Sequence, residues 1–192
     1  QVYFIDNEDY FKRKATLTDE EGNMFDDNDE RAIFFAKGVI ETVKKLNWSP
    51  DIIHVHGWLA SLLPLYLRRY YGNEPLFSGA KIVTSIYNQD FEGTLDEDMQ
   101  EKVLYDGMEK EDIKHLKTPN YVNLMKLAAD HSDAIITAGE DLPDTMNETK
   151  KVSPKVNKEE YVVTIRQLLK NPKLQMGKKD IEGTLEWLKK DR

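Results

Sequence analysis

The chain has 192 residues, no cysteine, and 27 Lys and Arg against 35 Asp and Glu, which gives a formal net charge of −8. This length fits one α/β domain, or one domain with an appended piece. The acidic charge argues against a general nucleic-acid or anionic-membrane surface. The missing cysteines exclude disulfides, thiolate catalysis and Cys-based metal sites. No apolar run approaches the roughly 20 residues of a membrane helix, and we expect a cytoplasmic protein without a membrane or nucleic-acid partner.

The first residues, QVYFID, predict a short strand over Val2–Ile5, because β-branched and aromatic side chains follow one another there. They carry neither an initiator Met nor the charged start of a signal peptide, and we expect the chain to begin inside a fold. Residues 6–29 are polar and acidic and predict a loop with a turn at Gly22 and Asn23.

A helix is predicted next, with Asn28 as its cap and Lys44 and Lys45 in its last turn. Its apolar residues recur at intervals of three and four, which forms a single stripe along the helix. These residues are Ala32, Phe35, Ala36, Val39, Ile40, Val43 and Leu46.

Short apolar strands and helices then alternate. The strands are predicted at Asp51–Val55, Lys81–Ile86 and Ser132–Thr137. One helix is predicted over Ser61–Tyr71, and another opens at Thr118 as cap and Pro119 as first helical residue and runs through Ala129. This alternation predicts an α/β fold with a Rossmann-like parallel sheet and helices on both of its faces.

The character of the sequence changes after Gly139. We expect a Rossmann-like domain over residues 1–139, followed over residues 140–192 by a polar linker and a helical C-terminal tail. Two amphipathic helices are predicted in that tail, at Glu159–Lys170 and Asp180–Lys190, with Trp187 as a docking residue. They could pack on the sheet or reach a neighbouring molecule.

Ligands of open parallel sheets bind at the carboxyl ends of the strands. The segments that end these strands carry His56, Trp58, Tyr87, Asn88, Asp90 and Glu92. Aromatic rings beside amides and carboxylates suit sugars, whose apolar faces stack on rings while their hydroxyls form hydrogen bonds. Asp90 and Glu92 could act as acid and base, or be ordinary surface carboxylates.

His54 and His56 alternate along a strand and point to the same side. No third ligand stands at motif spacing, and we expect one packed His and one His at the rim rather than a metal site. A structural role, as the cap and the exposed base of the long helix, also explains Asp27, Asn28 and Arg31. The sequence has no dinucleotide-binding glycine motif and no P-loop.

Three segments carry a resemblance to a known family: FDDNDER at 25–31, WSPDIIHVHGW at 48–58 and TSIYNQDFEG at 84–93. In order and spacing they resemble the glycogen/starch synthase family, and the likeness runs from Gln1 to about Gly139. Within that family, the sequence most resembles short single-domain bacterial members. The resemblance implies half of a GT-B fold and, for the family reaction, transfer of glucose from ADP-glucose to an α-1,4-glucan. The N-terminal domain of such enzymes mainly holds the acceptor glucan.

The strand ends and the resemblance together assign substrate contacts to Asp27, Asn28, Arg31, His56, Trp58, Tyr87, Asn88 and Asp90. The first three match the family's D-N-x-x-R segment, whose Asp lies near the reacting sugar. We assign no catalytic residue, no metal and no cofactor beyond ADP-glucose as donor substrate. The partners implied are an α-glucan and a nucleotide sugar, and the oligomeric state stays open.

Three positions depart from the family pattern. Gly57 and Leu59 stand where the H-x-H-D-W-H segment has its Asp and its last His, the residue that normally contacts the donor glucose. Tyr87 stands where the family has a His before the Asn. The family's phosphate-gripping Lys-x-Gly-Gly-Leu loop and its second domain have no counterpart in this sequence.

Two functions from different classes follow. The first is a glycogen/starch synthase-like glycosyltransferase domain that we expect to be inactive alone. The alternative is a non-catalytic glucan-binding or regulatory module that keeps the acceptor rim without the chemistry. A third, purely structural interpretation applies if no sugar binds.

Overall fold

The computed structural model describes residues 2–87, 91–105 and 107–137. The expected domain boundary at residue 139 and the predicted linker and helices beyond it lie outside the described residues. Among the described helices, none is both long enough and apolar enough to cross a membrane.

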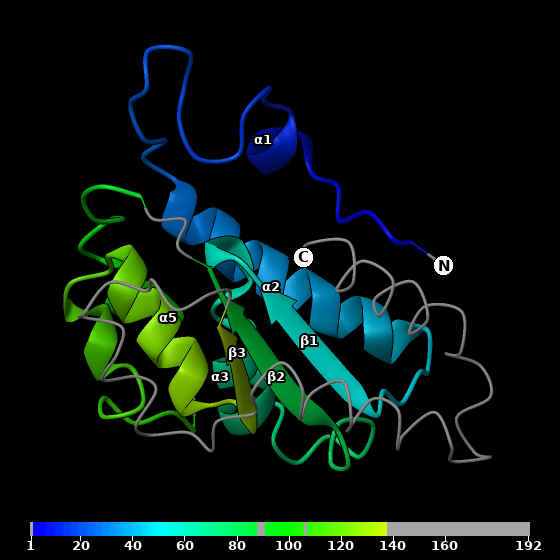
Figure 1. The fold of residues 1–192 in the computed structure, drawn as a ribbon. Coiled ribbons are helices and arrows are strands. Elements are labelled where there is room, and N and C mark those ends of the chain that lie inside the picture. The colour runs from blue at the N-terminus through cyan, green and yellow to red at the C-terminus, as the bar shows by residue number, and fades with distance from the viewer. Residues whose placement is uncertain (1, 88–90, 106, 138–192) are drawn as a thin grey trace. The chain divides into compact units, whose positions relative to one another are not determined.

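Three strands form one parallel sheet: β1 (Ile52–His56), β2 (Lys81–Ile86) and β3 (Ala134–Thr137). They pair side by side in chain order, β1 with β2 and β2 with β3 (Figure 1). Their continuous apolar runs are typical of strands that are covered on both faces. The predicted parallel α/β sheet is therefore confirmed.

The α-helices are α1 (Glu8–Phe11), α2 (Asn28–Lys45), α3 (Leu63–Arg69), α4 (Met99–Val103) and α5 (Tyr121–Asp130), with 3-10 turns at Trp58–Ala60 and Lys114–Lys117. Helix α3 contacts both α2 and α5, so these three form one layer beside the sheet. This arrangement agrees with crossovers that proceed in one direction along a sheet, because right-handed crossovers then place their helices on the same face. In the part of the chain that the structure describes, the expected helical layer is therefore present on one face of the sheet, not on both.

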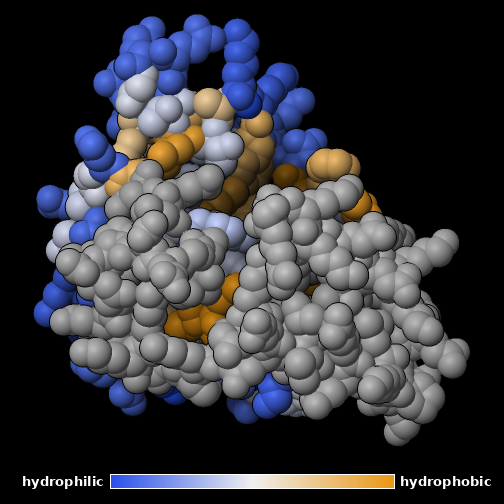
Figure 2. All heavy atoms as spheres, in the orientation of Figure 1, coloured by the Kyte–Doolittle hydropathy of each residue, from blue (hydrophilic) through white to orange (hydrophobic). Residues whose placement is uncertain are grey.

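Alternation along the strands separates two faces of the sheet. Val55, Ile82 and Ile135 face the helices and join their buried core. His54 and its neighbours in register point to the opposite face. In the orientation of Figure 1, an apolar patch shows in the region of the strands, whereas the projecting loop after α1 is mostly hydrophilic (Figure 2).

Helix α2 follows most of the predicted stripe, with Ala32, Ala36 and Ile40 fully buried. Leu46, the last residue of that stripe, is the C-cap and is 45% exposed. The predicted cap is wrong. Asp27 occupies the N-cap without a side-chain cap bond, and Asn28 is the first helical residue. The Asn28 side chain is buried and bonded elsewhere, so it does not cap the helix.

The strand predicted at Val2–Ile5 is also wrong, because these residues form an extended segment outside any strand. Val2 is 78% and Phe4 88% exposed. Strand propensity stabilises a chain only where the strand is paired and partly covered. Ile5 instead lies over α2, where its Cγ2 is 3.1 Å from the position that a Cβ on Gly38 would take.

Helix α5 begins two residues later than predicted. Asn120, not Thr118, is the N-cap, and its side-chain oxygen accepts the backbone N–H of Asn123 at 2.9 Å. Pro119 precedes the helix. Asn is a stronger cap than Thr, which accounts for the shift.

The other boundary shifts are small, and β1 is displaced by one residue at each end. Helix α3 begins at Leu63, with Pro64 in its first turn as expected. Strand β3 begins at Ala134, because the Asp133 carboxylate turns to accept the backbone N–H of Ile82 at 2.7 Å and to pair with Arg68.

A fully buried carboxylate ties α4 to the first turn of α2. Asp29 has no exposed surface, and its Oδ2 lies 2.9 Å from the Lys102 ammonium, which also pairs with Glu30 and Asp96. Removing one member of such a pair leaves a buried charge without compensation.

We expect Lys102→Met to lower the free energy of unfolding by about 2–3 kcal/mol, somewhat below the cost for a wholly buried pair because Lys102 is partly exposed. Chemical denaturation checks this value. Lys114→Met is the matched control, because it breaks an exposed pair with Glu111 and should change stability by less than about 0.5 kcal/mol. Equal losses in both variants would contradict the role given to Asp29.

Candidate functional site

The carboxyl ends of β1 and β2 bring an imidazole and a phenol together. His56 is the last residue of β1, and Tyr87 directly follows β2. The Nδ1 atom of His56 lies 2.7 Å from the Tyr87 hydroxyl, and the two rings are stacked with centroids 6.0 Å apart. Because the strands are parallel and in register, two segments 31 residues apart meet at one edge.

A second histidine supports the first. The ring of His54 lies on the same face, with its centroid 3.9 Å from that of His56. Its Nε2 atom is hydrogen-bonded to the hydroxyl of the buried Ser85 at 2.8 Å. We call His54, His56, Ser85 and Tyr87 the strand-end cluster.

Both imidazoles of the strand-end cluster are neutral at pH 7. Burial lowers the pKa of His54 to about 4, and the neighbouring His56 contributes further in the same direction. Partial burial of its ring also lowers the pKa of His56. The cluster therefore offers neutral hydrogen-bonding groups rather than a positive charge.

A series of aromatic contacts links the 3-10 turn after β1 to the backbone of Tyr87. Trp58, in the 3-10 turn after β1, meets Phe91 edge-on at 6.0 Å, and Phe91 meets Tyr121 edge-on at 5.8 Å. The Tyr121 hydroxyl donates to the backbone carbonyl of Tyr87 at 2.9 Å. Trp58 is partly buried against the core, so only part of its ring can meet a ligand.

The other predicted rim residues divide into two cases. Asn88 and Asp90 lie outside the described residues. Glu92 is exposed. Leu59, at the position of the family's last His, packs against the hydrophobic core.

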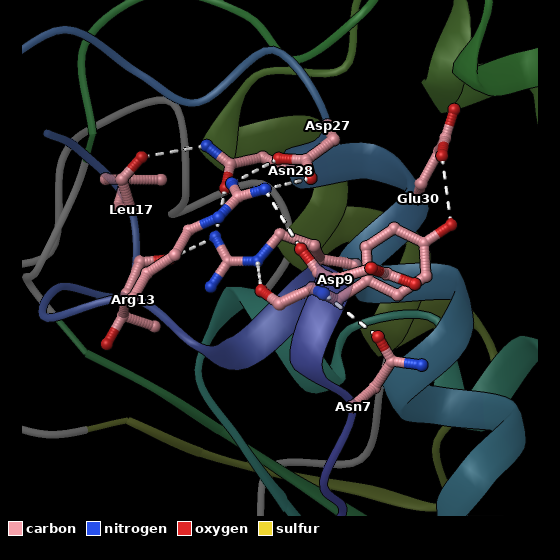
Figure 3. A network of polar contacts seen from close by, with 10 residues as sticks. Asn7, Asp9, Arg13, Leu17, Asp27, Asn28 and Glu30 are labelled. Carbon is pink, nitrogen blue, oxygen red and sulfur yellow. Dashed lines mark hydrogen bonds and ion pairs between the residues drawn. The ribbon is translucent and has the colours of Figure 1, made fainter.

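The start of α2 forms a second polar cluster, at the end of the molecule toward which the strands point (Figure 1). Both carboxylate oxygens of Asp27 accept from Arg13, at 2.6 and 2.5 Å (Figure 3). The Arg13 hydrogen bonds hold the pKa of the Asp27 carboxyl below its usual range. Asp27 therefore remains ionised and is engaged in a bidentate pair.

Arg31 belongs to the same polar cluster and is only 2% exposed. It donates to the backbone carbonyls of Tyr10 and Thr16 at 2.8 and 2.7 Å and to the Asn28 side chain at 2.6 Å. The Asn28 amide in turn donates to the carbonyl of Leu17 at 2.9 Å. Asn28 and Arg31 thus fasten the loop after α1 to the start of α2.

The structure thus gathers the predicted site residues into two groups. Asp27, Asn28 and Arg31 share the cluster at the start of α2, and His56 and Tyr87 meet at the strand ends. Two residues of these groups were not predicted from the sequence: Arg13, which holds Asp27 in place, and Tyr121, which holds the backbone of Tyr87. No local pattern marks either residue, because both act on partners that are distant in the sequence.

Two further features concern ligands. In the part of the chain that the structure describes, no group of three His, Cys, Asp or Glu side chains could hold a metal ion. A separate groove of about 460 Å³ runs along α2, with Tyr10, Phe34, Lys37 and Tyr105 among its lining residues. The Lys37 ammonium lies 3.5 Å from the centre of the Tyr105 ring. This groove shares no residue with the strand-end cluster.

Gly57 separates His56 from Trp58 in a backbone conformation that side chains rarely adopt, with φ +73° and ψ 167°. No atom crowds the position where a Cβ would lie, so the constraint is conformational rather than steric. This region is essentially restricted to glycine.

We expect Gly57→Asp, which restores the family's aspartate, to lower the free energy of unfolding by about 1–3 kcal/mol. Gly79→Asp is the matched control, since Gly79 has equal space and no positive φ. Thermal and chemical denaturation of both variants check this. Equal stability of Gly57→Asp and the unmodified chain would contradict the backbone argument.

The buried His54 predicts a pH-dependent stability. Between pH 6.5 and about 4, His54 is protonated in the unfolded chain but neutral in the folded protein. The free energy of unfolding therefore falls as the pH falls. We expect this to cost about 2 kcal/mol at pH 4.5 relative to pH 7. His54→Gln should remove that part of the pH dependence, as measured by urea denaturation at both pH values. Parallel pH profiles for the two proteins would contradict it.

Comparison with known proteins places these features in a family. The family model described as the starch synthase catalytic domain matches residues 1–149. Glycogen synthases from Chlorobium luteolum and Chlorobium limicola are 41% and 38% identical to the chain over 138 residues, which cover 71% of it. The glycogen synthase of Chlorobium phaeobacteroides is 37% identical over 151 residues, or 76% of the chain.

The chain spans only 28–29% of the length of these curated relatives. Among solved structures, the catalytic domain of starch synthase IV from Arabidopsis thaliana, bound to ADP and acarbose, aligns with a TM-score of 0.49 and 18% identity. That alignment covers 69% of this chain and 30% of the other. Because the family model matches well over half of its residues, the chain belongs to the starch synthase catalytic domain family.

Proposed function

We propose that this chain is the acceptor-holding part of a glycogen/starch synthase and binds an α-1,4-glucan at the carboxyl ends of β1 and β2. The complete protein would transfer glucose from ADP-glucose to that glucan. The observation that carries the proposal is the contact between His56 and Tyr87, which places two sugar-compatible side chains at the edge where parallel sheets bind ligands.

The chemistry of the strand-end cluster fits a neutral sugar. Low pKa values leave its imidazoles uncharged at pH 7, and neutral N–H and O–H groups match hydroxyls without the desolvation cost of a buried charge. The rings of Tyr87 and Trp58 offer apolar surface for a sugar face. We also propose that Asn88 and Asp90, which follow Tyr87 in the sequence, contribute polar contacts.

Among the described residues at the start of α2, neither arginine is available to bind the donor phosphates. Stabilisation of a leaving diphosphate requires preorganised positive charge. Arg13 is held by the Asp27 carboxylate, and Arg31 is buried among backbone carbonyls. We therefore propose that the chain by itself does not transfer glucose, and that the phosphate contacts come from the rest of the protein.

The alternative is a non-catalytic glucan-binding or regulatory module. It is favoured by Gly57 and by Leu59, which packs against the core at the position of the family's donor-contacting His. Both functions include glucan binding and differ in the activity of the complete protein. Glucosyl transfer by the full-length protein supports the first, and its absence with retained binding supports the second.

Glucan binding is tested by titrating a maltooligosaccharide into the 15N-labelled chain. We expect saturable chemical-shift changes at His56 and Tyr87, and a dissociation constant raised about 3- to 10-fold in His56→Ala, the equivalent of one hydrogen bond. His115→Ala is the matched control, because His115 pairs with Asp130 away from the strand ends. No response at millimolar sugar would contradict the proposal.

Glucosyl transfer is tested by incubating the purified chain with ADP-glucose and glycogen and measuring released ADP. We expect no release above the blank, because the diphosphate lacks compensating charge. Release above the blank would contradict the proposed division of labour between this chain and the rest of the protein.

The proposed location is the cytoplasm. The sequence has no cysteine and therefore no disulfide for which an oxidising compartment would be needed. The proposed partners are an α-glucan and, in the complete protein, a nucleotide sugar.

A further inference from the structure

The hydroxyl of Tyr87 has one described hydrogen-bond partner, the Nδ1 atom of His56 at 2.7 Å. A neutral imidazole has one protonated nitrogen and one acceptor nitrogen, so this contact selects one of two tautomers. Either Tyr87 donates to Nδ1 and the proton of His56 sits on Nε2, or Nδ1–H donates to the phenol oxygen.

The first arrangement is the stronger one. A phenol O–H is the more acidic donor of the pair, and an imidazole nitrogen is a better acceptor than a phenol oxygen. With Tyr87 donating, His56 carries its proton on Nε2, the ring nitrogen that the phenol does not touch. His56 is exposed, so this N–H can meet a ligand.

Both partners of this hydrogen bond are held in place. The backbone carbonyl of Tyr87 accepts from Tyr121, the first residue of α5, at 2.9 Å, and Tyr121 is only 4% exposed. On the other side, the His54 ring lies 3.9 Å from the His56 ring and is itself bonded to Ser85. The imidazole of His56 therefore lies between the phenol of Tyr87, whose backbone is anchored by Tyr121, and the ring of His54, which is bonded to Ser85.

From these contacts we infer that Tyr87 is a positioning residue that fixes the tautomer and orientation of His56, so that its Nε2–H is offered to a hydroxyl oxygen of the bound glucan. The ligand in this inference rests on the proposed function; the positioning does not. Tyr87 stands where the family pattern has a His, so the hydrogen bond from its phenol is a feature of this chain's own sequence.

The test uses Tyr87→Phe, which removes one oxygen and keeps the ring. Long-range 1H–15N correlation spectra of the 15N-labelled 192-residue chain at pH 7 report which imidazole nitrogen carries the proton. We expect an unprotonated Nδ1 and a protonated Nε2 for His56 in the unmodified chain, and exchange between both tautomers in Tyr87→Phe. Tyr70→Phe, at an exposed tyrosine, is the control and should leave the His56 signals unchanged.

Maltooligosaccharide titration of the same samples separates the two claims. We expect Tyr87→Phe to weaken binding about 3- to 10-fold through the loss of an ordered donor, with the folded spectrum retained. A protonated Nδ1 in the unmodified chain, or an unchanged tautomer in Tyr87→Phe, overturns the inference.

Two mixed outcomes are also decisive. A changed tautomer with unchanged affinity overturns the assignment of Nε2–H as the sugar contact. A changed tautomer with no sugar binding by any of the proteins overturns the proposed function and the ligand, while the positioning of His56 by Tyr87 stands.

Discussion

The parallel pairing of β1 with β2 is the constraint on which the candidate site depends. Its register sets His56 opposite Ser85, so that Tyr87, one residue beyond β2, meets the imidazole on the same face. A slip of one residue would turn the side chains of one strand to the other face of the sheet. The His56–Tyr87 contact would then be lost, although the core would keep its composition.

The start of α2 depends on a different interaction, the buried guanidinium of Arg31. It donates to the backbone carbonyl of Tyr10 in α1 and to that of Thr16 in the loop after α1, so that both acceptors have a partner. Arg13, which lies in the same loop, binds the Asp27 carboxylate at the N-cap of α2. The D-N-x-x-R segment of the family is thus part of the architecture here, and any contact that it makes with a sugar is added to that structural role.

The strands and the long helix were predictable because their signals are local. Lys81–Ile86 is bounded as expected, and the stripe of α2 faces the core. Val2–Ile5 shows the limit of this reasoning, because strand propensity cannot reveal whether a partner strand lies beside it. The caps at Asn28 and Thr118 failed for a related reason: several polar residues compete at each helix start, and tertiary contacts select among them.

The main residues of the candidate site could be predicted from the sequence, but the contacts between them could not. Strand ends and the family resemblance pointed to His56 and Tyr87, but the direct bond between them depends on the register. Intermolecular NOEs between the chain and a bound maltooligosaccharide test the central claim most directly. The account predicts NOEs from the Tyr87 ring and the His56 imidazole; NOEs confined to the groove along α2, at Tyr10, Phe34 and Tyr105, would contradict it.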